Sequence, residues 1–436
     1  MQTPVSIQHD CGNVSRRTIL QAGLTGLGAA TLPDLLRQRA AAGQASRKTS
    51  VIFIELAGGP TQFETYDPKP LAPVEYRGPM SAVQTNQPGV YFSETMSQQA
   101  KILDKLTIIR SIHHRKNNHD PSSHLSQTGY YKTGPKGGPN QMPSFGSVIH
   151  KVRGANTAGL PAYVAIPNTM RNGGSAHLGK GCNAFETIDN PSKKNFKVRN
   201  LALAGGMDMR RLDDRRGLLK ALDDDRRMLD LEGSSAAIDQ FTTQAFDMVS
   251  GSAARKAFDI FREDDKLRDA YGRSTAGQGM LLARRLVEAG VTCVTVRSTG
   301  WDHHGSLPKR IVKNGVEFDR GMAALVNDLY DRGLQQDVLV VAMGEFGRSP
   351  RFNKDAGRGH WGAVMSVALA GGGLKPGILG ASNSKGEIPA QAPYQPENVL
   401  AMLYRHLGID PAMTFDDLAG RPRYVLERRE LIRELV

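Results

Sequence analysis

The chain has 436 residues, of which 39% are hydrophobic and 23% charged, proportions typical of a soluble globular protein with a sizeable core. Its formal net charge of +13 favours anionic partners, but the basic residues are scattered, and no zinc-finger spacing or RNA-binding aromatic motif points to nucleic acid. The three cysteines form no CxxC pair, which argues against a disulfide framework and against a structural zinc site.

The first 45 residues have the pattern of an export signal rather than of a folded domain. Arg16 and Arg17 precede the weakly apolar run LQAGLTGLGAATLPDLL, and the Ala-rich segment RAAAGQAS follows it. This arrangement is similar to a twin-arginine signal; the alternative is a chance arginine pair before an N-terminal helix. We therefore predict a signal peptide over 1–45, recognition by the twin-arginine export machinery, and a periplasmic or secreted protein. No other run reaches the roughly 18 apolar residues of a membrane span.

Six nearly continuous apolar runs of strand length predict strands that are buried on both faces. They are VIFIEL (51–56), LTIIRSI (106–112), AYVAIP (162–167), VTCVTV (291–296), DVLVVAM (337–343) and VMSVALA (364–370). Helical patterns at 279–290 and 316–332 lie between strands, and the second helix joins two strands in a βαβ unit, which requires them to be parallel. The predicted fold class is α/β, with helices on both faces of one large, mostly parallel sheet.

Residues 207–275 interrupt this alternation. They are polar, charged and helical in pattern, with dense arginine and aspartate. We interpret them as a helical excursion from the sheet, with a solvated, salt-bridged surface, inside a single domain over 46–436.

Candidate residues for chemistry follow the predicted strands, because ligands of open α/β sheets bind at the carboxyl ends of the strands. The loops there, and the loop before the last strand, carry histidines with carboxylates and arginines: Glu64, Asp67, His113, His114, His119, His124, Asp302, His303, His304, Glu345, Arg348, Asp355, Arg358 and His360. Any one histidine could be structural, but several converging with carboxylates indicate a metal site. Such ligands suit a divalent metal, zinc most of all, with manganese, calcium or magnesium as alternatives, and one or two ions are expected.

Five stretches of the chain carry a resemblance to a known family. They are IELAGGPTQFETYDPKP, NNHDPSSHLSQTGYYKTG, AFDIFREDDKLRDAYGRSTAGQGMLLARRLVEAGVTCVTV, GWDHH and GEFGRSPRFNKDAGRGHWG. In this order they resemble the family labelled domain of unknown function 1501, which belongs with the sulfatases to the alkaline-phosphatase-like superfamily. The resemblance implies a three-layer α/β/α sandwich and a metal-dependent hydrolase ancestry.

The resemblance also implies a set of metal ligands by position. The superfamily uses an early acidic residue, an Asp with a His, an acidic residue after a further strand and a late His, and the matching residues after the early one are Asp302, His304, Glu345 and His360. The early acidic position falls on Glu55 at a strand end, with Glu64 and Asp67 as alternatives. Phe346 stands where the superfamily usually has a second ligand, so one of the two usual metal sites is expected to be altered or absent.

The stretch HDPSSHLSQTG is similar, without a gap, to the sulfatase nucleophile loop C-x-P-S-R and the helix that follows it. His119 falls on the nucleophile, and histidine cannot undergo the oxidation to an aldehyde that the sulfatase cysteine requires. Three roles stay open for His119: attack on phosphorus through a neutral ring nitrogen, ligation of a metal whose bound hydroxide attacks, or a relic in a non-catalytic binder.

Two further residues complete the predicted catalytic set. Ser122 lies one turn after His119 and is a second candidate nucleophile. Arg348 suits a bidentate grip on a phosphate or sulfate oxyanion, or alternatively an ion pair with Asp355.

The residues and the resemblance together predict an exported, metal-dependent hydrolase of phosphate or sulfate esters that uses metal-bound water or His119 as nucleophile. Its expected partner is an anionic ester, such as a sulfated or phosphorylated polysaccharide. The alternative is a catalytically silent metal-binding protein that recognises an anionic polysaccharide or a partner protein.

Overall fold

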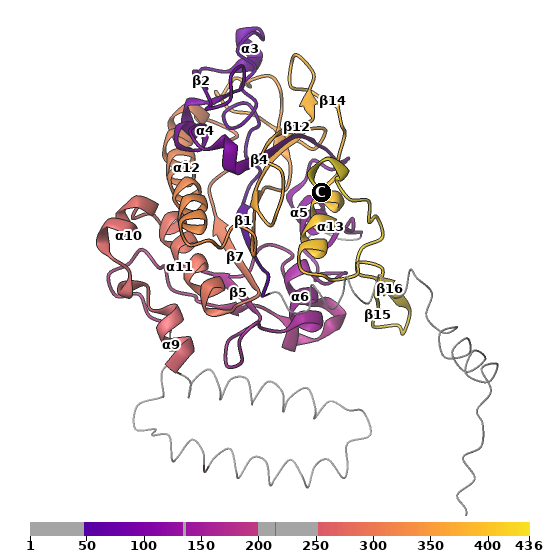
Figure 1. Cartoon of the computed structure of the whole chain (residues 1–436). Coiled ribbons are helices and arrows are strands. Elements are labelled where there is room, and N and C mark those ends of the chain that lie inside the picture. The colour runs from indigo at the N-terminus through magenta and orange to yellow at the C-terminus, as the bar shows by residue number, and fades with distance from the viewer. Residues whose placement is uncertain (1–47, 134–136, 199–213, 215–251) are drawn as a thin grey trace, which may run out of the picture. The chain divides into compact units, whose positions relative to one another are not determined.

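The fold is built on an eight-stranded sheet with the order β12-β4-β11-β8-β1-β7-β5-β6 (Figure 1). Its strands are β1 (Ser50–Leu56), β4 (Leu106–Ile112), β5 (Tyr163–Ile166), β6 (Phe185–Glu186), β7 (Cys293–Ser298), β8 (Val338–Met343), β11 (Met365–Gly371) and β12 (Gly377–Leu379). All six predicted strands lie in this sheet. The prediction of an α/β fold with one large, mostly parallel sheet is confirmed.

The structure, a computed structural model, describes residues 48–133, 137–198, 214 and 252–436. The signal peptide predicted over 1–45 lies outside these residues, as does most of the helical excursion predicted over 207–275. Lys48–Val436 form one compact unit. No helix within the described ranges is long and apolar enough to cross a membrane.

The two strands of the predicted βαβ unit, β7 and β8, are parallel but do not touch. β1 lies between them and pairs in parallel with both, so the connection through the intervening helix passes over β1. β11 alone among the described strands of this sheet runs antiparallel, to β8 and to β4. Every residue of β1 is buried, as its continuous apolar sequence requires for a central strand covered on both faces.

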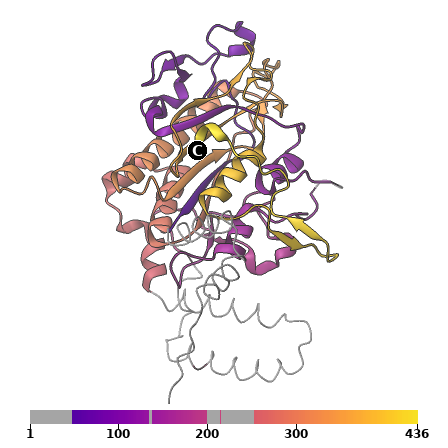
Figure 2. The same ribbon diagram turned by 45° about the vertical axis from the view of Figure 1, so that its right-hand side comes forward.

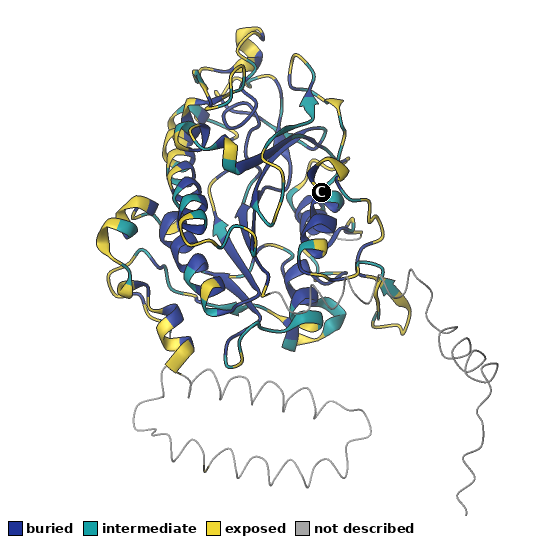
Figure 3. Ribbon diagram, viewed as in Figure 1, coloured by how far each residue is buried: buried dark blue, intermediate teal, exposed yellow. Residues whose placement is uncertain are grey.

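Helices cover both faces of the sheet (Figure 2). On one face lie α4 (Ser97–Ala100), α9 (Ser252–Phe258), α10 (Asp265–Tyr271), α11 (Thr275–Ala289) and α12 (Leu307–Asp331). On the other lie α5 (His119–Thr128), α6 (Phe145–Arg153) and α13 (Pro396–His406). Alternate residues of the strands face the two layers: Ile52 and Val294 join one hydrophobic core, and Val51 and Cys293 join the other. Figure 3 shows the sheet and the inner helix faces as buried.

The remaining elements are short. They are α3 (Val74–Arg77), β2 (Ala82–Gln84), β3 (Tyr91–Ser93), η1 (Glu94–Met96), η2 (Leu103–Lys105), η3 (Ala176–Leu178), η4 (Lys180–Cys182), η6 (Ile260–Arg262), β9 (Gly347–Arg348), β10 (His360–Trp361), β13 (Ala381–Ser382), β14 (Pro389–Gln391), β15 (Thr414–Asp416), β16 (Pro422–Tyr424) and η7 (Arg433–Leu435). The described end of the predicted excursion contains α9, η6 and α10. The next helix, α11, begins at Thr275, which is the last residue of the predicted excursion.

Candidate metal centre

The carboxyl ends of the central parallel strands bring the candidate residues together. β1 pairs with β7 and with β8 in parallel, so the segments that follow these strands start from one edge of the sheet. Asp302 and His304 follow β7, and Glu345 follows β8. They meet His119, the first residue of α5, and His360, the first residue of β10.

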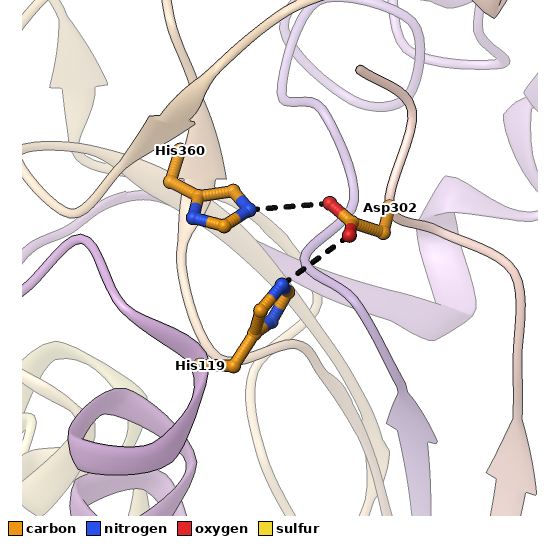
Figure 4. Close-up of side chains that lie close together, drawn as sticks. All are labelled: His119, Asp302 and His360. Carbon is orange, nitrogen blue, oxygen red and sulfur yellow. Dashed lines mark hydrogen bonds and ion pairs between the residues drawn. The ribbon is translucent and has the colours of Figure 1, made fainter. Parts of the chain in front are cut away.

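His119, Asp302 and His360 point toward one another (Figure 4), with one ligand atom of each within 4.8 Å of the others. Nε2 of His360 lies 3.2 Å from Oδ1 of Asp302, and Nε2 of His119 lies 3.3 Å from Oδ2. His304 lies beside two of them: its Nε2 is 3.1 Å from Oδ1 of Asp302 and 2.9 Å from Nε2 of His360. Tetrahedral bonds of about 2.0–2.1 Å separate ligand atoms by about 3.3 Å, so His119, Asp302 and His360 fit a zinc-sized divalent ion and would leave its fourth position open, as in catalytic zinc sites.

The hydrogen bond of Nδ1 determines which tautomer His360 adopts. Nδ1 donates a hydrogen bond to the carbonyl oxygen of Asn117 at 2.8 Å, so Nε2 carries a lone pair toward Asp302. Burial lowers the pKa of His360, which keeps the ring neutral. A histidine whose second nitrogen donates to a carbonyl or carboxylate is the usual form of a metal ligand.

His119 is oriented in the same way by a carboxylate. Its Nδ1 makes a short hydrogen bond with Oε1 of Glu345, and its Nε2 faces Asp302. The hydrogen bond to Glu345 raises the pKa of His119, the charges of Glu345 and Asp302 add to this effect, and burial opposes it. The structure therefore places Glu345 behind His119, outside the four-residue cluster.

A further histidine, His114, forms a hydrogen bond with the backbone of Glu345. The backbone N–H of Lys116 donates to Nδ1 of His114 at 3.2 Å, so the proton of the ring is on Nε2, which donates to the carbonyl oxygen of Glu345 at 2.7 Å. Burial lowers the pKa of His114 to about 4, and this ring stays neutral. His114 thus positions the residue that positions His119.

Arg348 supports Asp302 and is not open to a substrate. Its side chain is 0% exposed. The guanidinium donates to Oδ1 of Asp302 at 2.5 Å, to the carbonyl oxygen of Gly59 at 2.8 Å, and to the carbonyl oxygens of Gly58 and Arg358. Burial would raise the pKa of Asp302, but the hydrogen bond and charge of Arg348 lower it below its ordinary range. The predicted oxyanion grip, and the alternative ion pair with Asp355, are replaced by this contact.

Ser122 does not reach the cluster. Its side chain is buried in α5, and the hydroxyl donates to the carbonyl oxygen of Lys116 at 3.3 Å. It does not line the pocket beside His119. The structure therefore argues against Ser122 as a nucleophile.

Of the three candidates for the early acidic position, Glu55 lines the pocket beside His119, and it has an arginine partner. Glu55 and Arg297 are register partners on β1 and β7, with Nε of Arg297 3.1 Å from Oε2 of Glu55. Burial raises the pKa of Glu55 to about 7, and Arg297 opposes this rise. The alternatives lie elsewhere: Glu64 forms a buried ion pair with Arg358, and Asp67 accepts a hydrogen bond from Ser382.

The cluster opens on a pocket of about 200 Å³ lined by Glu55, Ala57, Gly58, His119, Arg171, Arg297, Thr299, Asp302 and Glu345. Arg171, Arg297 and Thr299 were not predicted. Arg171 follows β5, whose carboxyl end belongs to the same sheet edge, so the rule that located Asp302 would also have found it. His303, another candidate from the sequence, is buried beside Trp301, and burial lowers its pKa to about 4.

Comparisons with solved structures give distant similarities. Ps i-CgsB in complex with k-i-k-neocarrahexaose has 10% identity and a TM-score of 0.40, over 84% of this chain and 73% of that one. The PsFucS1 sulfatase from Pseudoalteromonas sp. has 11% identity and a TM-score of 0.37, over 86% and 72%. Alkaline phosphatase from the Antarctic bacterium TAB5 has 10% identity and a TM-score of 0.37, over 83% and 98%. Similarity at this level says nothing of substrate or mechanism.

No curated protein sequence matches the chain. The family model described as "Protein of unknown function (DUF1501)" matches residues 48–436, which is nearly everything after the predicted signal. The family resemblance predicted from the five sequence stretches is thereby confirmed. The chain belongs to the DUF1501 family.

Proposed function

We propose that this protein is a metal-dependent hydrolase of phosphate or sulfate esters. The observation that carries the proposal is the convergence of His119, Asp302, His304 and His360 beside a pocket that also contains two arginines. Imidazole and carboxylate donors suit zinc best, with manganese, calcium or magnesium as alternatives. A divalent ion held there would polarise an ester oxygen and lower the pKa of a water molecule.

The proposal assigns one ion to the site. His119, Asp302 and His360 supply three ligands at one point and would leave the fourth position of a tetrahedral ion for water or substrate, whereas the other two carboxylates of the pocket are already engaged. Glu55 is paired with Arg297, and Glu345 is bonded to His119. The guanidinium of Arg297 supplies positive charge where a second ion would otherwise be needed to offset Glu55.

His119 is proposed as a ligand rather than as a nucleophile. Each of its ring nitrogens faces a carboxylate, Nδ1 that of Glu345 and Nε2 that of Asp302. Attack on phosphorus would require Nε2 to leave Asp302 and the other ligands. Glu345 holds the ring so that Nε2 stays directed at the cluster, which is the arrangement of a metal ligand.

Arg16 and Arg17 support the further proposal that the protein is exported by the twin-arginine machinery to the periplasm or beyond. Its proposed partner there is an anionic ester, such as a sulfated or phosphorylated polysaccharide. Lysine substitution of both arginines, followed by fractionation of the cells, tests the export proposal.

Metal analysis paired with a substrate panel tests the hydrolase proposal. The folded protein is expected to contain about one equivalent of metal and to hydrolyse an aryl phosphate, a phosphodiester or an aryl sulfate. Asp302→Ala removes the carboxylate that contacts all three histidines, so we expect it to lose both the metal and the turnover. His177→Ala, outside the cluster, is the matched control and should keep both.

Two outcomes would count against the proposal. Turnover that persists without metal would remove the metal from the reaction. A metal-loaded, folded protein that hydrolyses none of the three ester classes would contradict the hydrolase proposal. It would favour the alternative, in which the protein binds metal but is catalytically silent.

A further inference from the structure

We infer that Arg171 is the oxyanion-binding residue of the pocket, and that a hydrogen-bonded latch between Asn172 and Asp120 fixes it relative to His119. The inference rests on the proposed function in one respect, because it takes the bound anion to be the phosphate or sulfate group of the substrate. It assigns a role to an arginine that no sequence motif marked.

Arg171 differs from the other arginines around the pocket. Arg297 is paired with Glu55, and Arg348 is buried against Asp302. Arg171 is exposed, lines the same pocket as His119, and makes no hydrogen bond or ion pair with another residue of the described ranges. Of the two arginines that line the pocket, Arg297 contacts a carboxylate directly and Arg171 does not.

The residue after Arg171 ties its loop to the first turn of α5. Asn172 has a left-handed backbone with φ of 58°, a conformation that asparagine tolerates better than most residues. Its side-chain Nδ2 donates to the carbonyl oxygen of Asp120 at 3.0 Å and to Oγ of Ser123 at 2.8 Å. Its carbonyl oxygen accepts a hydrogen bond from Nδ2 of Asn140 at 2.7 Å.

Asp120 is itself held firmly. Its carboxylate accepts from Nζ of Lys132 at 3.1 Å and from the backbone N–H of Gly137 at 3.0 Å, and the side chains of Asp120 and Lys132 are almost fully buried. Asp120 follows His119 directly, and Asn172 follows Arg171 directly. One network therefore fixes the backbone beside the candidate ligand and the backbone beside the unpaired cation.

The chemistry of this arrangement favours a small tetrahedral oxyanion. A guanidinium can donate two parallel hydrogen bonds to two oxygens of a phosphate or sulfate group. The pocket of about 200 Å³ is smaller than the roughly 300–1,000 Å³ of sites that enclose a drug-sized ligand. It suits the oxyanion itself, so the remainder of an ester would extend outside it.

Calorimetric titration of the metal-loaded, full-length folded protein with inorganic phosphate, and separately with inorganic sulfate, tests the inference. Arg171→Gln should weaken binding of the preferred anion by about 10- to 100-fold, as expected for loss of a charged hydrogen-bond donor, while the metal content stays the same. Arg262→Gln, an exposed arginine outside the pocket, is the matched control. Arg171→Lys should recover part of the affinity, since lysine keeps the positive charge but lacks the two parallel N–H donors of the guanidinium.

Asn172→Gly tests the latch, because glycine accepts the positive φ but lacks the amide. This variant should weaken anion binding by less than Arg171→Gln, with unchanged metal content and an unchanged far-ultraviolet spectrum. Wild-type affinity in Arg171→Gln, or no binding of either anion by the wild-type protein at millimolar concentration, would overturn the inference. Wild-type affinity in Asn172→Gly would overturn the latch.

The test separates this inference from the proposed function. If the wild-type protein hydrolyses esters and Arg171→Gln binds phosphate and sulfate as the wild type does, the inference fails and the function stands. If the protein hydrolyses no ester but its anion binding depends on Arg171, the function fails and the inference stands.

Discussion

His119 has a carboxylate at each ring nitrogen, and this pair of contacts determines what the residue can do. Of the three roles that the sequence left open, attack on phosphorus needs a free nitrogen, and a relic has no need of two carboxylates. The contact between Nδ1 and Glu345 leaves Nε2 directed at Asp302, near His360. The geometry therefore favours ligation among the three roles.

We expect Glu345→Gln to lower the metal affinity by about 10- to 100-fold, the usual cost of removing the charged partner of a ligating histidine. The amide keeps the shape and can still accept from Nδ1, but it no longer strengthens the basicity of Nε2. Competition with a chromogenic chelator measures the affinity. Glu427→Gln, on the exposed surface, is the control. Equal affinities of Glu345→Gln and the wild type would show that this carboxylate does not support the metal.

Asp302, His304 and His360 could be located from the sequence because their order along the chain follows the strands that carry them. The place of Arg171 after β5 could be predicted by the same rule, but the contacts that fix its loop could not. They depend on the left-handed backbone of Asn172 and on a segment about 50 residues away, and neither leaves a periodic pattern. The role of Arg348 was misjudged because the sequence does not show that five oxygen acceptors surround its guanidinium.

At the scale of elements, the loop between β9 and β10 is anchored by a buried ion pair. Both nitrogens of the Arg358 fork contact the carboxylate of Glu64, at 2.8 and 3.1 Å, and both side chains are 0% exposed. The guanidinium also lies between the rings of Phe63 and Phe352, 4.2 Å from each ring centre. Because Arg358 precedes His360 by two residues, this anchor fixes the strand that presents a candidate ligand.

Glu64→Gln should lower the free energy of unfolding by about 3–5 kcal/mol, because it leaves the Arg358 charge buried without its counter-charge. Urea unfolding followed by circular dichroism measures the change. The exposed substitution Glu75→Gln should stay within about 0.5 kcal/mol of the wild type. If Glu64→Gln also stays within that range, the ion pair does not anchor the loop.

The sequence predicted the elements better than their limits and directions. The helix expected over 316–332 begins at Leu307, because 307–315 carries several charges that hide the continuing apolar stripe of Leu307 and Ile311. The antiparallel direction of β11 also had no signal. A parallel neighbour requires a crossover, usually helical, and the short β9 and β10 strands that precede β11 make a hairpin instead.

At the scale of the whole molecule, the alternation of apolar runs and helical patterns was sufficient to predict the fold class, because a buried parallel sheet leaves little choice of residues in its strands. The order of the strands was not predictable in the same way. β1, which is first in the sheet along the chain, lies at the centre between β7 and β8, and this placement depends on contacts between segments about 240 to 290 residues apart.

The central strands are tied to the C-terminal helix by a buried histidine. His406, the last residue of α13, has Nε2 at 3.1 Å from the carbonyl oxygen of Ser50 and at 3.2 Å from that of Asp337. These carbonyls lie at the starts of β1 and β8. Burial lowers the pKa of His406 to about 4, so the ring is neutral in the folded protein at neutral pH.

This pKa predicts how the stability of the fold depends on pH. Between an unfolded pKa of about 6.5 and a folded pKa of about 4, the unfolded chain binds the proton and the folded chain does not. The contribution of His406 to the free energy of unfolding is therefore fully present above pH 6.5 and is lost as the pH falls toward 4, by up to about 1.4 kcal/mol per pH unit.

In His406→Asn, which has no titrating ring, the free energy of unfolding should fall less steeply over this interval, even if the variant is less stable at pH 7. Urea unfolding of both proteins from pH 4.5 to 7.5, with chelator present so that metal binding does not contribute, measures the two slopes. Parallel slopes would show that His406 does not remain neutral in the folded state.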